Sequence, residues 1–185
     1  TVRLHHVRFS NNQLLGAVGL LMPSSSCSAV EMIDIQFRDN ECNGICGAAL
    51  STENSLRRID IEGNVHVGEV GDDIPTILFA PANSETQARR ITARNNTGSV
   101  MLIEEGSLTM SDSTFSDNFA DLTELQDDPF SASLNLANAS AEINDCIFQG
   151  NQGDFGSAIF AFGSSISLIS CTFTENSAGT GGAIY

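Results

Sequence analysis

The sequence predicts an all-β protein, a right-handed parallel β-helix (solenoid) of about seven three-strand coils that is uncapped at both ends. Three observations predict it: one short motif recurs along the whole chain, apolar residues alternate before each copy, and no segment shows a convincing helical pattern. One coil cannot bury its own apolar face, so the repeats are expected to stack on one another. Residues 1–185 are therefore interpreted as a single β-helix segment, with a flat β-sandwich as the alternative.

The recurring motif is Phe-x-x-Asn, in which the final asparagine sets the period. Complete copies begin at Phe9, Phe37, Phe115, Phe148 and Phe173, and degenerate copies begin at Ile61 and Ala93. The asparagines are Asn12, Asn40, Asn64, Asn96, Asn118, Asn151 and Asn176. Their mean spacing of about 27 residues, 164 residues over six steps, lies within the range of solenoid repeats.

Stacked parallel coils place like residues over like residues at a spacing of about 4.8 Å. The motif therefore predicts a column of phenylalanine rings in which Ile61 and Ala93 are smaller members. It also predicts a ladder of asparagine side chains at a buried turn, each amide bonded to the next. An unpaired buried amide would cost about 1–3 kcal/mol, which gives a physical reason for asparagine at this position in each coil.

Alternating apolar residues before each motif predict two strands in each coil. In one coil they are Val30, Met32 and Ile35, which lie seven, five and two residues before Phe37. The steps of two are strand alternation, and the step of three indicates a bend between the strands. A third apolar strand is expected after a variable turn, with examples that begin at Gly16, Gly47, Gly98, Gly156 and Gly181.

The last two coils carry a resemblance to a known family. The segments "FTEN…GGAIY" from Phe173 and "FQGN…GSAIF" from Phe148 resemble the FxxN and GGA[ILV] repeats of the chlamydial polymorphic membrane proteins and related surface β-helices. The coils of Asn64 and Asn96 lack both the phenylalanine and the Gly-Gly-Ala element. The resemblance implies a secreted, adhesin-like passenger domain built as a parallel β-helix.

Charge is distributed unevenly along this chain, whose formal net charge is −15. All 8 basic residues are arginines that precede residue 98, whereas 12 of the 23 acidic residues follow that point without any base. Such a field opposes binding to nucleic acid and to anionic membranes. No apolar run approaches the ~20 residues that span a bilayer. We expect an extracellular or cell-surface protein without nucleic-acid partners, direct membrane insertion or cofactors.

Neither end of the sequence shows a capping segment. Thr1 enters a coil directly, and Tyr185 leaves one in mid-turn. End coils expose unpaired backbone groups, which solenoids usually cover. We therefore expect an excerpt of a longer solenoid, or ends that stack on partners. Further β-helix coils or other copies of the protein are the predicted partners, and glycans are a further candidate.

Arginines recur at matching positions of successive coils and form a candidate basic stripe. Its predicted ligand-binding members are Arg57, Arg58, Arg89, Arg90 and Arg94. Planar guanidinium groups bind sulfate and carboxylate in a bidentate manner, so the stripe could hold a sulfated or carboxylated polysaccharide. The alternative is ordinary surface pairing with the neighbouring acids Asp34, Asp60 and Glu62, which are individually weak contacts.

A β-helix polysaccharide lyase or hydrolase is the enzymatic alternative to a structural role. Such enzymes need carboxylates that converge on a groove. Asp34, Asp112 and Asp145 lie at equivalent positions, but only Asp112 and Asp145 fall on neighbouring coils. No catalytic residue is therefore assigned, and no His or Cys spacing indicates a metal site. The expected function is a non-catalytic structural or adhesion module, with an enzyme or acidic-polysaccharide-binding module as the alternative.

Cysteines and sequons complete the candidate sites. Cys146 and Cys171 share one inward position and are expected to be buried thiols, with a disulfide between them as the alternative. Cys42 and Cys46 flank a turn, where a local disulfide or one to Cys27 is plausible. Two sequons occur, at Asn95, which should face outward beside the ladder, and at Asn138, which lies at a turn. Both are predicted glycosylation sites if the source is eukaryotic and the chain is secreted, with chance occurrence as the alternative.

Overall fold

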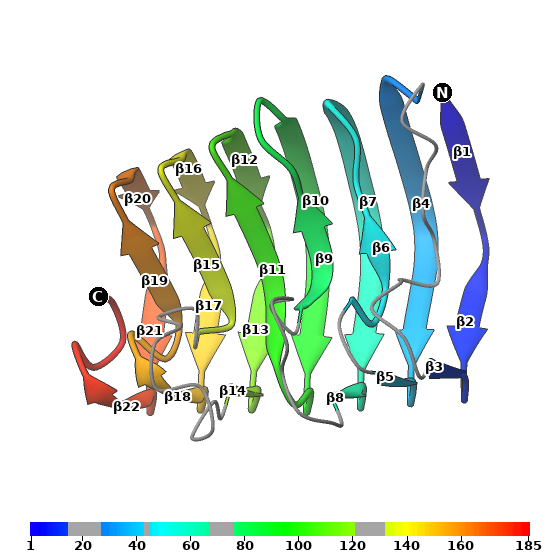
Figure 1. Cartoon of the computed structure of the whole chain (residues 1–185). Helices are drawn as coiled ribbons and strands as arrows, with labels where there is room; N and C mark the ends of the chain where they lie inside the picture. Colours follow the sequence, from blue (N-terminus) through cyan, green and yellow to red (C-terminus); the bar gives the residue numbers. More distant parts are fainter. Residues whose placement is uncertain (15–26, 43–44, 67–75, 121–131) are drawn as a thin grey trace.

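Parallel strands from successive turns of the chain lie side by side and build a stack of coils (Figure 1). This computed structural model describes residues 1–14, 27–42, 45–66, 76–120 and 132–185. Every strand pair in these ranges is parallel, and no helix occurs in them. Accordingly, the described residues include no helix of the length and apolarity needed to cross a membrane. The predicted parallel β-helix is confirmed.

The largest sheet contains the strands that precede and include the Phe-x-x-Asn motif. Its main path runs through β1 (Val2–His5), β4 (Ala29–Arg38), β7 (Glu53–Glu62), β10 (Glu85–Arg94), β12 (Ser107–Ser111), β16 (Ser140–Asn144) and β20 (Ser165–Ile169). Four shorter strands extend it beyond the bend: β2 (Arg8–Ser10), β13 (Thr114–Ser116), β17 (Ile147–Gln149) and β21 (Thr172–Thr174). We call this sheet the long sheet.

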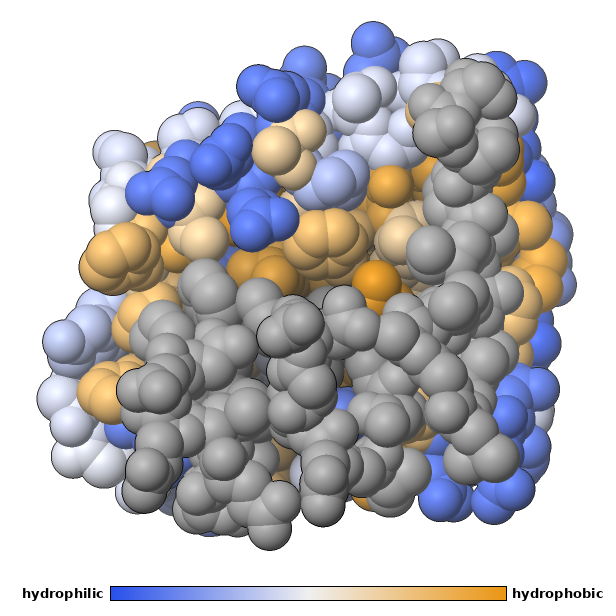
Figure 2. Space-filling model, in the orientation of Figure 1, coloured by the Kyte–Doolittle hydropathy of each residue, from blue (hydrophilic) through white to orange (hydrophobic). Residues whose placement is uncertain are grey.

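A second sheet is formed by the strands predicted after the variable turn. Its order is β19 (Ile159–Phe162), β15 (Leu134–Ala137), β11 (Ser99–Glu104), β9 (Thr76–Ala80) and β6 (Ala48–Ala49). Figure 2 shows apolar side chains gathered over this sheet in the middle of the visible face. The segment from Gly181 differs from the prediction, because only Ile184 forms a bridge, to Ile159. The strand predicted from Gly16 lies outside the described residues.

The sequence reading missed a short strand directly after the ladder asparagine, where a variable turn was expected. These strands form two small sheets: β3 (Gln13–Leu14), β5 (Glu41–Cys42) and β8 (Val65–His66) in one, and β14 (Phe119–Ala120), β18 (Gln152–Phe155) and β22 (Ser177–Thr180) in the other. The ladder asparagine explains them, because it holds neighbouring coils in register at the point where these strands begin.

The asparagine ladder is continuous, as predicted. Each Nδ2 group donates to Oδ1 of the asparagine in the next coil at 2.8–3.0 Å, from Asn12 through to Asn176. The same amide also donates to a backbone carbonyl of the preceding coil, as Asn64 does to Phe37 at 2.9 Å. Asn40, Asn64 and Asn96 are at most 1% exposed. The ladder therefore satisfies buried polar groups on three consecutive coils at once.

The phenylalanine column is also confirmed. Phe9 stacks on Phe37 with ring centroids 5.2 Å apart, and Phe148 stacks on Phe173 at 5.0 Å. Ile61 and Ala93 occupy the same register between the two groups of rings. Smaller side chains therefore replace the rings in the degenerate coils without interrupting the hydrogen-bonded register.

The predicted bend is a single residue with positive φ, three positions before the phenylalanine. The residues are His6, Asp34, Arg58, Arg90, Asp112, Asp145 and Ser170, with φ between 52° and 57°. In β4, β7 and β10 the strand continues through this residue, so two predicted strands are one strand of 10 residues. One residue with a left-handed conformation shifts the alternation of inward and outward side chains without breaking the sheet. The two residues that lie four and three positions before the phenylalanine are therefore both outside the core.

Candidate functional site

Two Arg-Arg pairs meet at the bend of the long sheet. Arg57 of β7 lies in register with Arg89 of β10, and Arg58 and Arg90 occupy the left-handed positions that follow them. All four side chains are exposed and line one small cavity of about 20 Å³. The cavity has room for about one water molecule. We call these four residues the arginine cluster.

Carboxylates flank the arginine cluster on two sides. Arg58 binds Asp34, with Nη2 at 2.7 Å from Oδ2, and Nδ1 of His6 lies 3.2 Å from the same oxygen. The hydrogen bond from Arg58 lowers the pKa of Asp34, and the nearby His6 and Arg57 add to this effect. On the other side, Nε of Arg89 lies 2.8 Å from Oδ2 of Asp112.

The remaining two members of the arginine cluster have no such partner. Within the described ranges, Arg57 and Arg90 form no ion pair or side-chain hydrogen bond. Four guanidinium groups thus share two carboxylates, and only two of the four form a direct ion pair, on a chain with a net charge of −15. Like charges opposite one another on neighbouring strands repel, so an anion between them would be stabilised.

A polar groove continues from the arginine cluster along the outer face of the long sheet. A depression of about 200 Å³ shares Arg57 and Arg89 with the cluster and is lined further by Ser55, Gln87 and Thr109, among others. Ser55 and Gln87 also line the next depression, of about 430 Å³. The two depressions and the cluster therefore lie next to one another on the outer face of the long sheet, from β1 to β12, and together we call them the groove.

The far end of this groove is acidic. Glu31, Glu53 and Glu85 line the larger depression together with Arg3, whose Nε lies 2.9 Å from Oε2 of Glu31. Glu53 and Glu85 are in register on neighbouring strands. The sequence analysis missed these residues, although they occupy outward positions of the strand alternation that identified the core. The groove thus has a basic end and an acidic end.

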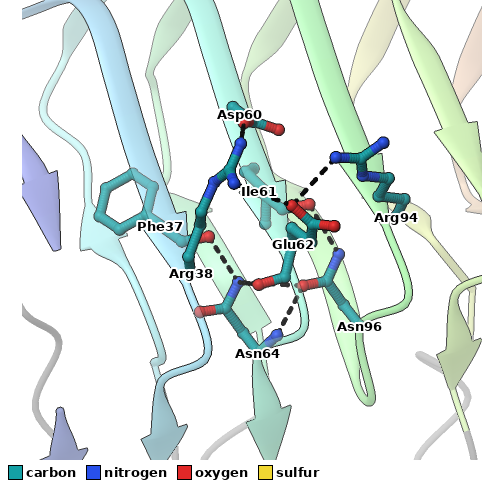
Figure 3. Close-up of polar contacts among 8 residues, drawn as sticks. All are labelled: Phe37, Arg38, Asp60, Ile61, Glu62, Asn64, Arg94 and Asn96. Atoms are coloured by element: carbon teal, nitrogen blue, oxygen red, sulfur yellow. Dashed lines mark hydrogen bonds and ion pairs between the residues drawn. The ribbon is translucent and has the colours of Figure 1, made fainter. Parts of the chain in front are cut away.

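Arg94 lies apart from the arginine cluster. Its Nη2 is 3.0 Å from Oε2 of Glu62, and Arg38 binds both Glu62, at 3.3 Å, and Asp60 (Figure 3). The hydrogen bond that Arg94 donates lowers the pKa of Glu62, and the hydrogen bond that Arg38 donates to Asp60 raises the pKa of Arg38. These pairs lie beside the ladder at Asn64 (Figure 3) and match the surface-pairing alternative.

Two of the three aspartates considered for catalysis, Asp34 and Asp112, flank the arginine cluster and are each bound by one of its arginines. Asp112 and Asp145 follow residues that are in register on β12 and β16, so they lie on neighbouring coils as predicted. Asp112 is engaged by Arg89. Among the described residues, no group of three or more His, Cys, Asp or Glu side chains could hold a metal ion.

Both sequon asparagines are exposed. Asn95 and Asn138 have positive φ, of 53° and 49°, and lie outside the core. Oδ1 of Asn138 lies over the backbone of Gly163 in the next coil, where an added Cβ would be only 2.5 Å away. Both side chains are therefore open to solvent in the folded chain, and their glycosylation stays a prediction.

The cysteines separate into one disulfide and three thiols. Cys42 and Cys46 form a disulfide across the predicted turn, with their Cα atoms 5.4 Å apart. Cys146 is a fully buried thiol, and Cys171 and Cys27 are half-buried thiols. Burial raises the pKa of Cys146 to about 11. The expected thiol at Cys146 is confirmed, and Cys171 is more exposed than expected because it lies in the last described coil.

Comparison with known proteins identifies the fold. A family model described as "right handed beta helix region" matches residues 76–185, which is more than half of the chain. No curated protein and no solved structure gives a match. The matched segment includes Arg89 and Arg90 on β10 but not Arg57 and Arg58 on β7.

Proposed function

This chain belongs to the family of right-handed β-helix regions, and from that premise we propose that it is a non-catalytic structural and adhesion module at the cell surface. The observation that carries the proposal is the continuous asparagine ladder. It joins each coil to the coils before and after it, with buried hydrogen bonds of 2.8–3.0 Å between asparagine side chains. Such a ladder stabilises a stiff rod whose outer faces display side chains in fixed columns.

The repeat sequence supports an exposed location. The FxxN and Gly-Gly-Ala elements resemble those of the chlamydial polymorphic membrane proteins, and the asparagine of the first element is the ladder residue of this chain. The net charge of −15 favours solubility and disfavours non-specific adsorption to anionic surfaces. The disulfide between Cys42 and Cys46 is typical of an oxidising compartment.

Stacking at the two end coils forms part of the proposal. Within the described residues, Phe9 and Phe173 each stack on a single neighbouring ring and are only half-buried. A further coil, or a second copy of the chain, would cover the open side of each ring and pair the adjacent strand edge. Both kinds of partner would lengthen the rod along the axis of the ladder.

The location can be tested with antibodies raised against the purified chain. We expect the antibodies to label intact, non-permeabilised cells of the source organism, and beads coated with the chain to adhere to extracellular matrix or to neighbouring cells. Labelling that appears only after the cells are permeabilised would overturn the surface role. Beads that adhere no better than beads coated with an unrelated acidic protein would overturn adhesion.

A carbohydrate-active enzyme is the second candidate, and the acidic end of the groove favours it. Glu53 and Glu85 lie in register on neighbouring coils, an arrangement that can bring two carboxylates to one glycosidic bond. The test is release of reducing ends or unsaturated sugars from a panel of polysaccharides. Release that is abolished by Glu53→Gln and Glu85→Gln would establish the enzyme and exclude a purely structural role.

A further inference from the structure

We propose that the groove of the long sheet binds a glycan that carries one isolated sulfate ester, with the sulfate in the arginine cluster and the sugar in the adjoining polar depression. The inference rests on the proposed surface role and names the ligand class for it. It draws on three observations: two arginines without an ion pair, lining residues shared between the cluster and the depressions, and the opposite charge at the two ends of the groove.

The arginine cluster supplies the anion site. Arg57 and Arg90 have no carboxylate partner in the described part of the chain, while Asp34 and Asp112 hold Arg58 and Arg89 in place from outside. The outer carboxylates fix two guanidinium groups around the 20 Å³ cavity. Two arginines are thus preorganised, and two are free to donate to a ligand.

The adjoining depression has both polar and apolar lining, as a sugar ring with its hydroxyl groups and C–H faces requires. It measures about 200 Å³ and is lined by Ser55, Gln87, Thr109 and Ser111 together with Leu56 and Ala88. Hydroxyl and amide side chains donate and accept hydrogen bonds, as sugar hydroxyl groups require. Because Arg57 and Arg89 line both this depression and the cavity, a substituent on a bound sugar ring can reach the cluster.

The acidic end limits the charge of the ligand. Glu31, Glu53 and Glu85 line the next depression, so a second anionic group further along the glycan would meet carboxylates. A densely sulfated chain is repelled there, whereas a neutral sugar is tolerated. A sulfate ester carries one negative charge, whereas a phosphate carries about −1.5 to −2, and the overall charge of −15 disfavours the larger value. Sulfate also has three oxygens, which can accept from guanidinium groups of both strands.

The experiment measures binding of a singly sulfated oligosaccharide to the full chain by calorimetry. Its unsulfated counterpart, inorganic sulfate and heparin are the comparison ligands. We expect the sulfated sugar to bind at least about tenfold more tightly than either the unsulfated sugar or inorganic sulfate. Arg57→Ala and Arg90→Ala should each weaken its binding by about tenfold.

Arg8→Ala is the matched control, because Arg8 is exposed, makes no ion pair in the described residues and lies on β2 outside the groove. It changes the net charge equally and should leave the affinity unchanged. Equal weakening by all three substitutions, tighter binding of heparin, or full affinity for sulfate alone would each overturn the proposal. The melting temperature of each variant confirms folding. A failed surface-labelling experiment would remove the surface role without altering these affinities, so the two failures are distinguishable.

Discussion

The amide of Asn96 lies between two other asparagines: its Oδ1 accepts from Nδ2 of Asn64 at 3.0 Å, and its Nδ2 donates to Oδ1 of Asn118 at 2.8 Å. The same Oδ1 also accepts the backbone N–H of Asn64 at 3.0 Å. One side chain therefore satisfies buried groups in the coils on both sides of it.

Replacing Asn96 by alanine should destabilise the chain by roughly 2–4 kcal/mol, because buried donors and acceptors on two neighbouring coils lose their partners. Urea unfolding followed by circular dichroism measures the loss. Asn12→Ala is the control: Asn12 donates to Asn40 but, among described residues, accepts no amide, so about 1 kcal/mol is expected. Equal losses at the two positions would contradict the importance of ladder continuity.

Gly150→Ala should destabilise the chain more than Gly182→Ala. Both glycines have positive φ, but a Cβ at Gly150 would lie 2.5 Å from Oδ1 of Asp117, whereas nothing lies within 4 Å at Gly182. The left-handed conformation alone costs a non-glycine residue about 1–2 kcal/mol. The additional loss at Gly150 should disappear in the double variant with Asp117→Ala, measured by thermal unfolding. Persistence of that loss would exclude the contact as its cause.

Asp34→Asn should reduce stability at neutral pH and have little effect in acid. The hydrogen bond from Arg58 holds the pKa of Asp34 below its ordinary value. A lowered carboxyl pKa contributes stability above the unfolded-state value of about 3.9, and the contribution is lost as the pH falls through the lower folded-state value. The melting temperatures of the unsubstituted chain and of the Asp34→Asn variant should therefore converge as the pH is lowered from about 7 to about 2. In a chain that also carries Arg58→Ala, the effect of Asp34→Asn on the melting temperature should depend less on pH.

The thiol of Cys146 should react slowly with iodoacetamide in the folded chain. Burial raises its pKa to about 11, so little thiolate is present near pH 8, and the side chain has no exposed surface. Half-buried Cys27 is the comparison and should be alkylated first, as measured by peptide mass spectrometry. In urea the rates should become similar. Fast labelling of Cys146 in the native chain would show that its coil opens readily.

The core columns could be predicted from the sequence because stacked coils repeat the same environment. Phe37 belongs to the phenylalanine column and Asn40 to the asparagine ladder, and both columns are recognisable because the residue type recurs. The spacing of the recurring motif then gives the register of neighbouring strands. Two buried polar residues, Asn54 and Thr86, interrupt a column that is apolar elsewhere. They bond to each other at 3.1 Å, a pairing that only the strand register shows.

The candidate site was less predictable. Matching positions placed Arg57 beside Arg89, but the sequence could not show that Arg94 instead pairs with Glu62. The groove was missed because its lining residues share no chemical type, and their alignment depends on the long strands of the sheet. Side-chain pairing and surface shape depend on rotamers and neighbours, which a repeat pattern does not specify.

The direction of the hydrogen bonds between coils determines how the rod responds to force. They run along the direction in which the coils stack, from β1 towards β20 (Figure 1), so a pull on the two ends loads every layer in series. Each layer then bears the whole force, and the least bonded one opens first. Tension should therefore unfold the rod one coil at a time, releasing a length of extended polypeptide while the remaining coils stay folded.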